Sequence, residues 1–190
     1  MPFDDESQIV VLVPSREEWR TEFVVLSERL AETLGGVAAA IDHVGSTAVP
    51  GLAAKDVIDA QVRVRSLDPA GVVGLERIGF RRRPEPWNRE DRIGEERFAK
   101  AVFAPPVGER PVNVHVRLEG SPNARYALLF RDFLRADEAA RRAWGGLKAA
   151  VAEVAPDLLS YGSVKAAALP LLMQSAERWA EATGWTPEAS

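Results

Sequence analysis

The chain has 190 residues, 46% hydrophobic and 27% charged, which is ordinary for a globular protein with a sizeable core. It has no cysteine, which excludes disulfides and thiolate chemistry, and it has neither a long apolar run nor a charged leader followed by an apolar one. The formal net charge of -4 argues against a protein that binds nucleic acids in general. We therefore expect one cytoplasmic domain over 1–190, with no membrane segment and with disordered ends at 1–7 and 186–190.

The N-terminal part predicts a short strand, a helix and a second strand. Residues 9–13 are typical of a strand, and Ser15 is placed as the N-cap of a helix that runs to Leu34 and ends at Gly35. Apolar residues recur in this helix at three- and four-residue spacing and predict its core face: Trp19, Phe23, Leu26, Leu30 and Leu34. Residues 38–44 predict the first strand of a sheet.

The turn after this strand has the composition of an anion-binding loop. Gly45 can adopt a positive φ and leaves room for a close ligand, while Ser46 and Thr47 add hydroxyl donors. Successive N-H groups in such a turn form a concavity for anions. The alternative is an ordinary turn, which His43 at the end of the strand would brace.

Residues 57–64 predict a buried strand with one polar face. With a period of two, Asp59 and Gln61 point to that face and the apolar residues to the other. Asp59 is a candidate site residue, and the alternative for it is an ion pair with Arg63 or Lys55.

The middle of the chain predicts a helix, a loop and a hairpin. Residues 69–80 are typical of a short helix, and the proline-interrupted loop 84–88 is a candidate substrate lid. Residues 98–103 and 112–118 predict a strand pair, in which Asn113, His115 and Arg117 share one face that can converge with Asp59. Several arginines around the loop are typical of a solvated surface, with phosphate binding as the alternative: Arg77, Arg81, Arg82, Arg83, Arg89 and Arg92.

From residue 123 to 185 the pattern is helical. An apolar stripe marks the first helix, a second helix runs through Trp144 and Val151, and a third extends from about Ser160 through Trp179.

Several spaced motifs resemble the GrpB (UPF0157) family, which is similar to the nucleotidyltransferase superfamily of DNA polymerase beta. The matching segments span nearly the whole chain: His43–Leu52, Val57–Asp59, Val114–Val116 with Gly120 and Ser121, Phe130–Arg135, and Tyr161 with Lys165. The resemblance implies an α+β fold with a nucleotidyltransferase-like mixed sheet, flanking helices and a C-terminal helical part.

The resemblance also implies an activity, the transfer of a nucleotidyl group from a nucleoside triphosphate to a small-molecule acceptor. Twelve residues separate Ser46 from Asp59, which fits the superfamily pattern. On this resemblance we expect Asp59, His115 and Lys165 to be catalytic, and Asp59 with Gln61 to hold one Mg²⁺ ion. The implied nucleotide-binding residues are Gly45, Ser46, Thr47, Lys55, Arg125, Arg131 and Tyr161.

Two positions depart from the superfamily. Gln61 stands where a second carboxylate is expected, and His115 where a third is expected. A close pair of Mg²⁺ ions would then lack neutralising charge. Two alternatives therefore remain open: an ATP-dependent ligase that activates a carboxylate as its adenylate for amide formation, and a non-catalytic nucleotide-binding module.

Overall fold

The computed structural model describes residues 9–187, so the disorder predicted for 1–7 and 186–190 falls, apart from residues 186 and 187, outside the described residues. The elements in chain order are α1 Glu18–Leu34, β1 Ala38–Val44, β2 Ile58–Val64, α2 Pro69–Arg77, β3 Arg81–Arg82, β4 Glu90–Ile93, β5 Glu96–Ala104, β6 Val112–Leu118, α3 Pro122–Ala136, α4 Glu138–Val154 and α5 Leu158–Thr183. Short 3-10 helices cover 35–37, 46–48 and 86–88.

The described strands form a mixed sheet in the order β1-β2-β6-β5-β3, with β4 paired to β5. The pairs β1–β2 and β5–β6 are antiparallel, whereas β2 and β6 are parallel. This central parallel pair places Asp59 opposite Asn113 and Gln61 opposite His115. Two segments that are far apart in the sequence thus present their polar side chains on one surface.

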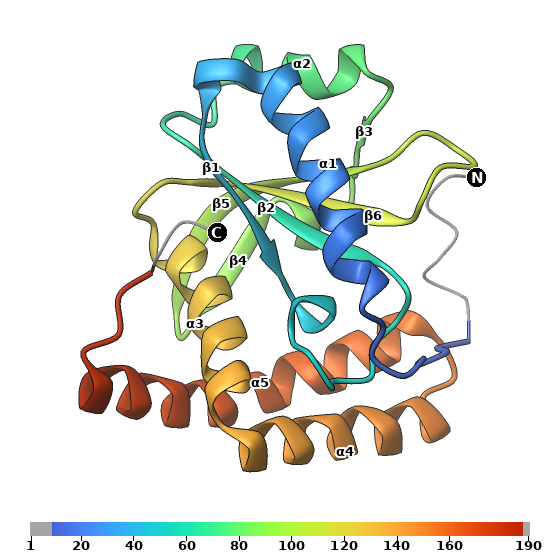
Figure 1. Cartoon of the computed structure of the whole chain (residues 1–190), viewed down its shortest axis with the longest axis vertical. Coiled ribbons are helices and arrows are strands. Elements are labelled where there is room, and N and C mark those ends of the chain that lie inside the picture. Colours follow the sequence, from blue (N-terminus) through green and yellow to red (C-terminus); the bar gives the residue numbers. More distant parts are fainter. Residues whose placement is uncertain (1–8, 188–190) are drawn as a thin grey trace.

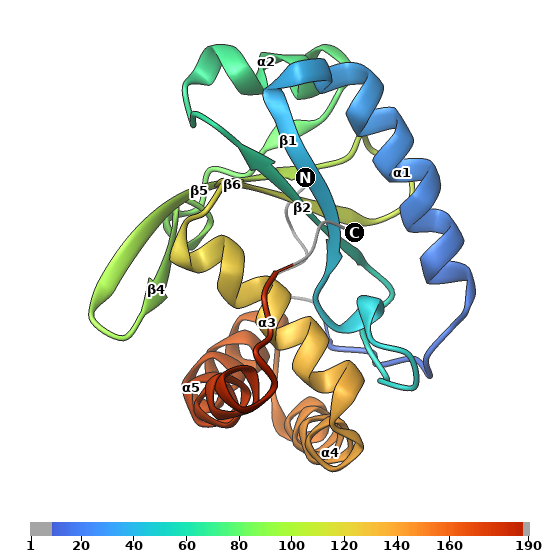
Figure 2. The ribbon, with the colours of Figure 1, turned by 60° about the vertical axis from the view of Figure 1, so that its left-hand side comes forward.

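The helices lie on both sides of the sheet. Figures 1 and 2 show α1 and α2 over one face and the group α3, α4 and α5 toward the other. The expected α+β class, with a mixed sheet, flanking helices and a C-terminal helical part, is confirmed. No helix within residues 9–187 has an apolar stretch long enough to cross a bilayer.

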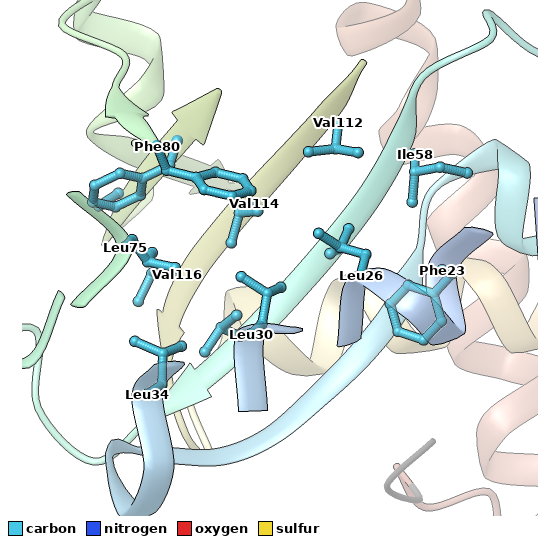
Figure 3. Packing of buried hydrophobic residues seen from close by; sticks show 14 of the residues in the cluster. Phe23, Leu26, Leu30, Leu34, Ile58, Leu75, Phe80, Val112, Val114 and Val116 are labelled. Carbon is cyan, nitrogen blue, oxygen red and sulfur yellow. The ribbon is translucent and has the colours of Figure 1, made fainter. Parts of the chain in front are cut away.

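The main core lies between α1 and the apolar face of the sheet. All five residues predicted for the core face of α1 are buried: Trp19, Phe23, Leu26, Leu30 and Leu34. They pack against Ile58 on β2, against Val114 and Val116 on β6, and toward Phe80 (Figure 3). Because these residues occupy one side of β2 and β6, the polar side chains of the same strands must face α3 and the C-terminal helices.

The segment before α1 differs from the prediction. Residues 9–13 form no strand, and Val13 makes only an isolated bridge to Ala54. Val10 instead packs against Val151 and Tyr161 of the C-terminal helices. Ser15 is not the N-cap, because its hydroxyl accepts a hydrogen bond from the Gly51 amide at 3.0 Å, and α1 begins only at Glu18.

The region of the proposed lid also differs. Residues 86–88 form a 3-10 helix, and none of the residues 84–88 lines a pocket next to the turn. The strand β4, which follows, was not predicted because Glu90–Ile93 is a charged stretch without apolar alternation. Residues Asp91, Arg92 and Ile93 of β4, and not the residues of the predicted lid, line the larger of two pockets beside the Gly-Ser turn.

Leu30→Ala should lower the free energy of unfolding by about 2–5 kcal/mol, because Leu30 is 0% exposed within the α1 core. Leu171→Ala is the matched control, since Leu171 also lies in a helix but is 70% exposed, and it should change stability by less than about 0.5 kcal/mol. Urea unfolding measures both. Similar losses in the two variants would contradict this description of the core.

Candidate functional site

The carboxylate of Asp59 lies directly against the Gly-Ser turn. Val44 at the end of β1 pairs with Asp59 on β2, and Gly45 follows with a φ of 70°. A Cβ atom at Gly45 would stand 2.5 Å from Oδ2 of Asp59 and 3.0 Å from its Cβ. Glycine is therefore required here by the backbone conformation and by the neighbouring carboxylate.

The side chain and the carbonyl of His43 hold this turn in place. Its Nε2 lies 3.0 Å from Oγ1 of Thr47, its ring stacks on Phe23, and its carbonyl accepts a hydrogen bond from Arg131 at 3.2 Å. Burial lowers the pKa of His43 to about 4, and the charge of Asp59 offsets this only in part. The predicted bracing role of His43 is confirmed. Thr47 was predicted to bind nucleotide, but it is buried and its hydroxyl is engaged with the imidazole.

Two residues of β6 contact Asp59, as the shared polar face predicts. Nδ2 of Asn113 donates to Oδ1 of Asp59 at 3.0 Å, and Nε2 of His115 lies 3.5 Å from the same oxygen. Burial alone would raise the pKa of Asp59, but the hydrogen bond from His115 and the charge that His115 carries at acid pH, together with the hydrogen bond from Asn113 and the charge of Lys55, lower it to about 2. Burial lowers the pKa of His115. The site thus holds an ionised carboxylate beside a neutral imidazole.

Gln61 does not offer its oxygen to a metal. Oε1 accepts a hydrogen bond from Arg117 at 2.9 Å, and Nε2 donates to Asp42 at 3.3 Å. The side chain is 0% exposed and lines neither pocket next to the turn. The prediction of Gln61 as a metal ligand is therefore wrong, because its oxygen faces a guanidinium. Arg63 pairs with Asp42 at 2.9 Å, so the alternative of an Arg63–Asp59 ion pair is excluded as well.

Arg117 connects Gln61 to a second carboxylate that the sequence did not point to. Its Nε donates to Oδ2 of Asp91 at 2.8 Å, and Lys100 donates to Oδ1 at 2.6 Å. Burial opposes ionisation of Asp91, but the charges of Arg117 and Lys100 hold its pKa well below the usual range. Asp91 is thus the counter-ion of two cations.

Two adjoining pockets open beside the turn, one of about 340 Å³ and one of about 260 Å³. They share four lining residues: Ser46, Asp59, His115 and Lys165. The larger pocket also has apolar and aromatic walls, which include Ile93, Tyr126, Phe130, Trp144 and Leu169. The smaller pocket is more polar and includes Thr47, Lys55, Asn113, Lys148 and Tyr161. We call the smaller one the lysine pocket.

The predicted residues Lys55, Tyr161 and Lys165 meet in the lysine pocket. Nζ of Lys165 lies 4.5 Å from the centre of the Tyr161 ring, which is a cation-π distance. Burial and the charge of Lys55 lower the pKa of Lys165 to about 8, against the opposing charge of Asp59. Burial raises the pKa of Tyr161 to about 12, so its ring is uncharged at neutral pH.

Two predicted arginines lie outside both pockets. Arg125 forms a two-pronged ion pair with Glu177 at 2.6 and 2.8 Å and lies over the Trp185 ring. Arg131 is 4% exposed and is held by Asp132 at 2.7 Å and by the His43 carbonyl. The prediction that they bind nucleotide is corrected, because each guanidinium is engaged in joining structural elements.

Sequence reasoning missed Lys148, which is 2% exposed, is hydrogen-bonded to Oγ of Ser46 at 3.1 Å, and donates to the Ala53 carbonyl. A signal was present, since Lys148 falls on the same face of α4 as Trp144 and Val151. A lysine within an apolar helical stripe has to be buried or to reach out of the core.

Few of the described side chains at the site could coordinate a metal ion. Among residues 9–187 no group of three or more acidic or histidine side chains is placed to hold a metal ion. Asp59 is the carboxylate that faces both pockets without a paired cation at hydrogen-bond distance. One carboxylate fits a single Mg²⁺ ion only if phosphate oxygens and waters complete its shell.

Gly45→Ala should destabilise the protein more than Gly120→Ala. The two glycines have nearly equal φ values, 70° and 73°, so the left-handed backbone costs each variant about 1–2 kcal/mol. A Cβ at Gly120 meets nothing within 4 Å, whereas one at Gly45 meets Asp59, so we expect a further ~1–3 kcal/mol there. Urea unfolding checks this, and Asp59→Ala should recover part of the difference. Equal losses at both glycines would count against the close approach.

Acid should destabilise the protein through His43. Its pKa is about 4 in the folded state and 6.5 as the ordinary value, so between these pH values only the unfolded chain takes up the proton. Stability that is present above pH 6.5 is therefore lost as the pH falls toward 4, by up to about 3 kcal/mol. His43→Gln removes the titrating group and should flatten the dependence. Urea unfolding of both proteins at pH 7 and 4.5 tests this, and parallel pH profiles would refute it.

Comparison with known proteins identifies a family and several relatives of this chain. A family model described as GrpB protein matches residues 9–175. A dephospho-CoA kinase of Mycolicibacterium paratuberculosis is 36% identical over an alignment that covers 94% of this chain and 48% of that protein. The UPF0157 protein YqkA of Bacillus subtilis is 30% identical, over 90% of this chain and 48% of that protein. The chain thus spans about half the length of these curated relatives.

The crystal structure of the conserved protein GrpB from Enterococcus faecalis has the same fold. It matches with a TM-score of 0.73 and 24% identity, and the match covers 89% of this chain and 99% of that chain. The shared arrangement, a mixed sheet with helices on both sides, is consistent with a nucleotidyltransferase-like fold. The resemblance noted in the sequence is confirmed at the level of the family, and this chain belongs to the GrpB family.

Proposed function

We propose that the two pockets bind a nucleoside triphosphate and that the chain transfers its nucleotidyl group to a small-molecule acceptor. The observation that carries this proposal is the Gly45–Ser46 turn, which is pressed against Asp59 while Lys55 and Lys165 line the same pocket. A half-buried Gly-Ser turn, two amines and one carboxylate match the charge of a phosphate chain with one cation.

The residues divide the work as follows. The Ser46 hydroxyl and the amides of the turn bind phosphate oxygens, and Lys55 and Lys165 neutralise their charge. Asp59 would hold a single Mg²⁺ ion together with the phosphates, and the ion would withdraw electron density from them. Gln61 offers no oxygen to a second ion, because its Oε1 is directed at Arg117, and residues 9–187 contain no group of three or more acidic or histidine side chains placed to hold a metal.

The acceptor would occupy the larger pocket. Its walls include Tyr126, Phe130 and Trp144, which suit a ring or another apolar group, while Asp59 and His115 line both pockets. His115 is uncharged at neutral pH because burial lowers its pKa. Its Nε2 faces Asp59 and its Nδ1 is buried without a hydrogen-bond partner among the described residues, so in this proposal His115 orients Asp59 and does not itself take the proton of the acceptor.

Relatives that are named dephospho-CoA kinase support the use of a nucleotide. They are about twice as long as this chain, and this sequence contains no G-x-x-x-x-G-K-[ST] segment. We therefore propose nucleotide binding by the Gly-Ser turn and not phosphoryl transfer by a P-loop.

A non-catalytic nucleotide-binding module is the second candidate. It is favoured by the Gln61 side chain, which is fixed between Asp42 and Arg117 and supplies neither charge nor a metal ligand. This candidate requires binding without turnover, whereas the transferase requires pyrophosphate release with some acceptor.

Calorimetric titration with ATP, CTP, GTP and UTP, with and without Mg²⁺, is the test. We expect at least one triphosphate to bind the wild-type protein more tightly with Mg²⁺, and Asp59→Asn to lose this increase. Ser46→Ala should weaken binding about tenfold or more, because a hydrogen bond to a charged group contributes ~1.5 kcal/mol or more.

Arg125→Ala is the control, since Arg125 pairs with Glu177 outside the pockets and its loss should leave affinity unchanged. Absence of binding for every nucleotide would refute the proposal. If Mg²⁺ increases the affinity of Asp59→Asn as much as that of the wild type, only the assigned role of Asp59 is refuted, and nucleotide binding stands. A screen for pyrophosphate release with alcohol and amine acceptors then separates the transferase from the binding module.

A further inference from the structure

Lys148 is a buried amine that the proposed reaction does not use. It lies on α4, is 2% exposed, and has no carboxylate within ion-pair distance among residues 9–187. Its partners are Oγ of Ser46, at 3.1 Å, and the Ala53 carbonyl. A buried charge without a counter-ion is costly, so these surroundings favour the neutral amine. Burial, aided by the charge of Lys165, lowers the pKa of Lys148 to about 7.

The surroundings of Lys148 contain little negative charge. The titratable groups that line the lysine pocket with it are Lys55, Asp59, His115, Tyr161 and Lys165. The ring of Tyr161 is uncharged, His115 is neutral, and the carboxylate of Asp59 already accepts hydrogen bonds from β6. A ligand with two or more negative charges would therefore supply the counter-charge that this set of amines lacks.

The hydrogen bonds of a neutral and of a protonated amine differ at Ser46. A neutral amine keeps one lone pair, so while one N-H donates to the Ala53 carbonyl, the lone pair can accept the hydroxyl proton of Ser46. A protonated amine has only donors, so Oγ of Ser46 must accept, and its own proton becomes available to another acceptor. The two protonation states thus set opposite directions for one hydrogen bond.

We propose that Lys148 is a positioning residue for Ser46, and that a bound polyphosphate draws a solvent proton onto its amine. The added proton reverses the Ser46–Lys148 hydrogen bond, and the Ser46 hydroxyl then donates to a phosphate oxygen. The ligand class is a chain of two or more phosphates, with or without a nucleoside. This inference rests on the proposed phosphate site and adds a proton to its binding equilibrium.

Inorganic tripolyphosphate without metal is the probe, because it carries the negative charge of a triphosphate without a nucleoside. Calorimetry at pH 8 in buffers of different ionisation heat gives the number of protons bound with the ligand. Lys165 also titrates near this pH, so the informative quantity is the difference in proton uptake between wild type and Lys148→Met. We expect this difference to be about half a proton or more, with the larger uptake in the wild type. We also expect the affinity of the wild type to fall more steeply between pH 7 and 8.5.

Lys148→Met fills a similar volume and removes the buried amine, and its thermal unfolding shows whether it folds. NMR of wild-type protein with ¹³Cε-labelled lysine is an independent measurement, in which tripolyphosphate should raise the titration midpoint of the Lys148 signal. Lys148→Arg identifies that signal by its absence.

The outcomes separate the two proposals. Failure of both tripolyphosphate and nucleotides to bind overturns the proposed function together with this inference. Binding with equal proton uptake in wild type and Lys148→Met, or with an unshifted Lys148 midpoint, overturns this inference and leaves the phosphate site standing.

Discussion

The contact between Gly45 and the carboxylate of Asp59 is the constraint on which the site depends. It fixes where β1 ends, because no residue with a side chain can follow Val44 at this distance from Oδ2. The turn is then held by His43 through Thr47, and Lys148 contacts Ser46 from the side of the helices. A sheet edge and a helical layer thus hold three consecutive residues of a turn, so the turn is preorganised before any ligand arrives.

The polar face of the sheet is divided into a locked part and an open part. In the locked part, Asp42 and Arg63 pair, Gln61 bridges to Arg117, and Arg117 pairs with Asp91. These groups satisfy one another and connect β1, β2, β6 and β4, so they serve the fold. In the open part, the side-chain polar partners of Asp59 within residues 9–187, Asn113 and His115, both come from β6, and the carboxylate faces the pockets. The amide at position 61 therefore serves the structure, and Asp59 is the carboxylate on this face that the proposed function uses.

Periodicity predicted those parts of the molecule in which burial follows the local pattern. The apolar positions of α1, the alternation of β2 and the hairpin partner β6 each face a single continuous core, so spacing alone identifies them. The convergence of Asn113 and His115 on Asp59 followed from the same alternation once the strands pair in register. The composition of the turn suggested anion binding, and the family resemblance added the expectation that the anion is a nucleoside triphosphate, which stays a prediction.

The remaining features depend on partners that lie far away in the sequence. Arg125 and Arg131 look like phosphate ligands until Glu177 and the His43 carbonyl are seen beside them. The strand β4 is held by pairing with β5 and by the ion pairs of Asp91, neither of which its own residues reveal. Ser15 is a good N-cap residue by type, but tertiary contact with Gly51 overrides that local preference.

The parallel pairing of β2 with β6 also bears on the order in which the molecule can form. Asp59 and Asn113 are 54 residues apart, and Lys148 and Ser46 are 102 apart, so these contacts close long loops at a high entropic cost. Contacts of this kind slow folding relative to local ones. Lys148 and Lys165 lie on α4 and α5, the last two helices of the chain, so the lysine pocket is complete only when this long-range arrangement has formed.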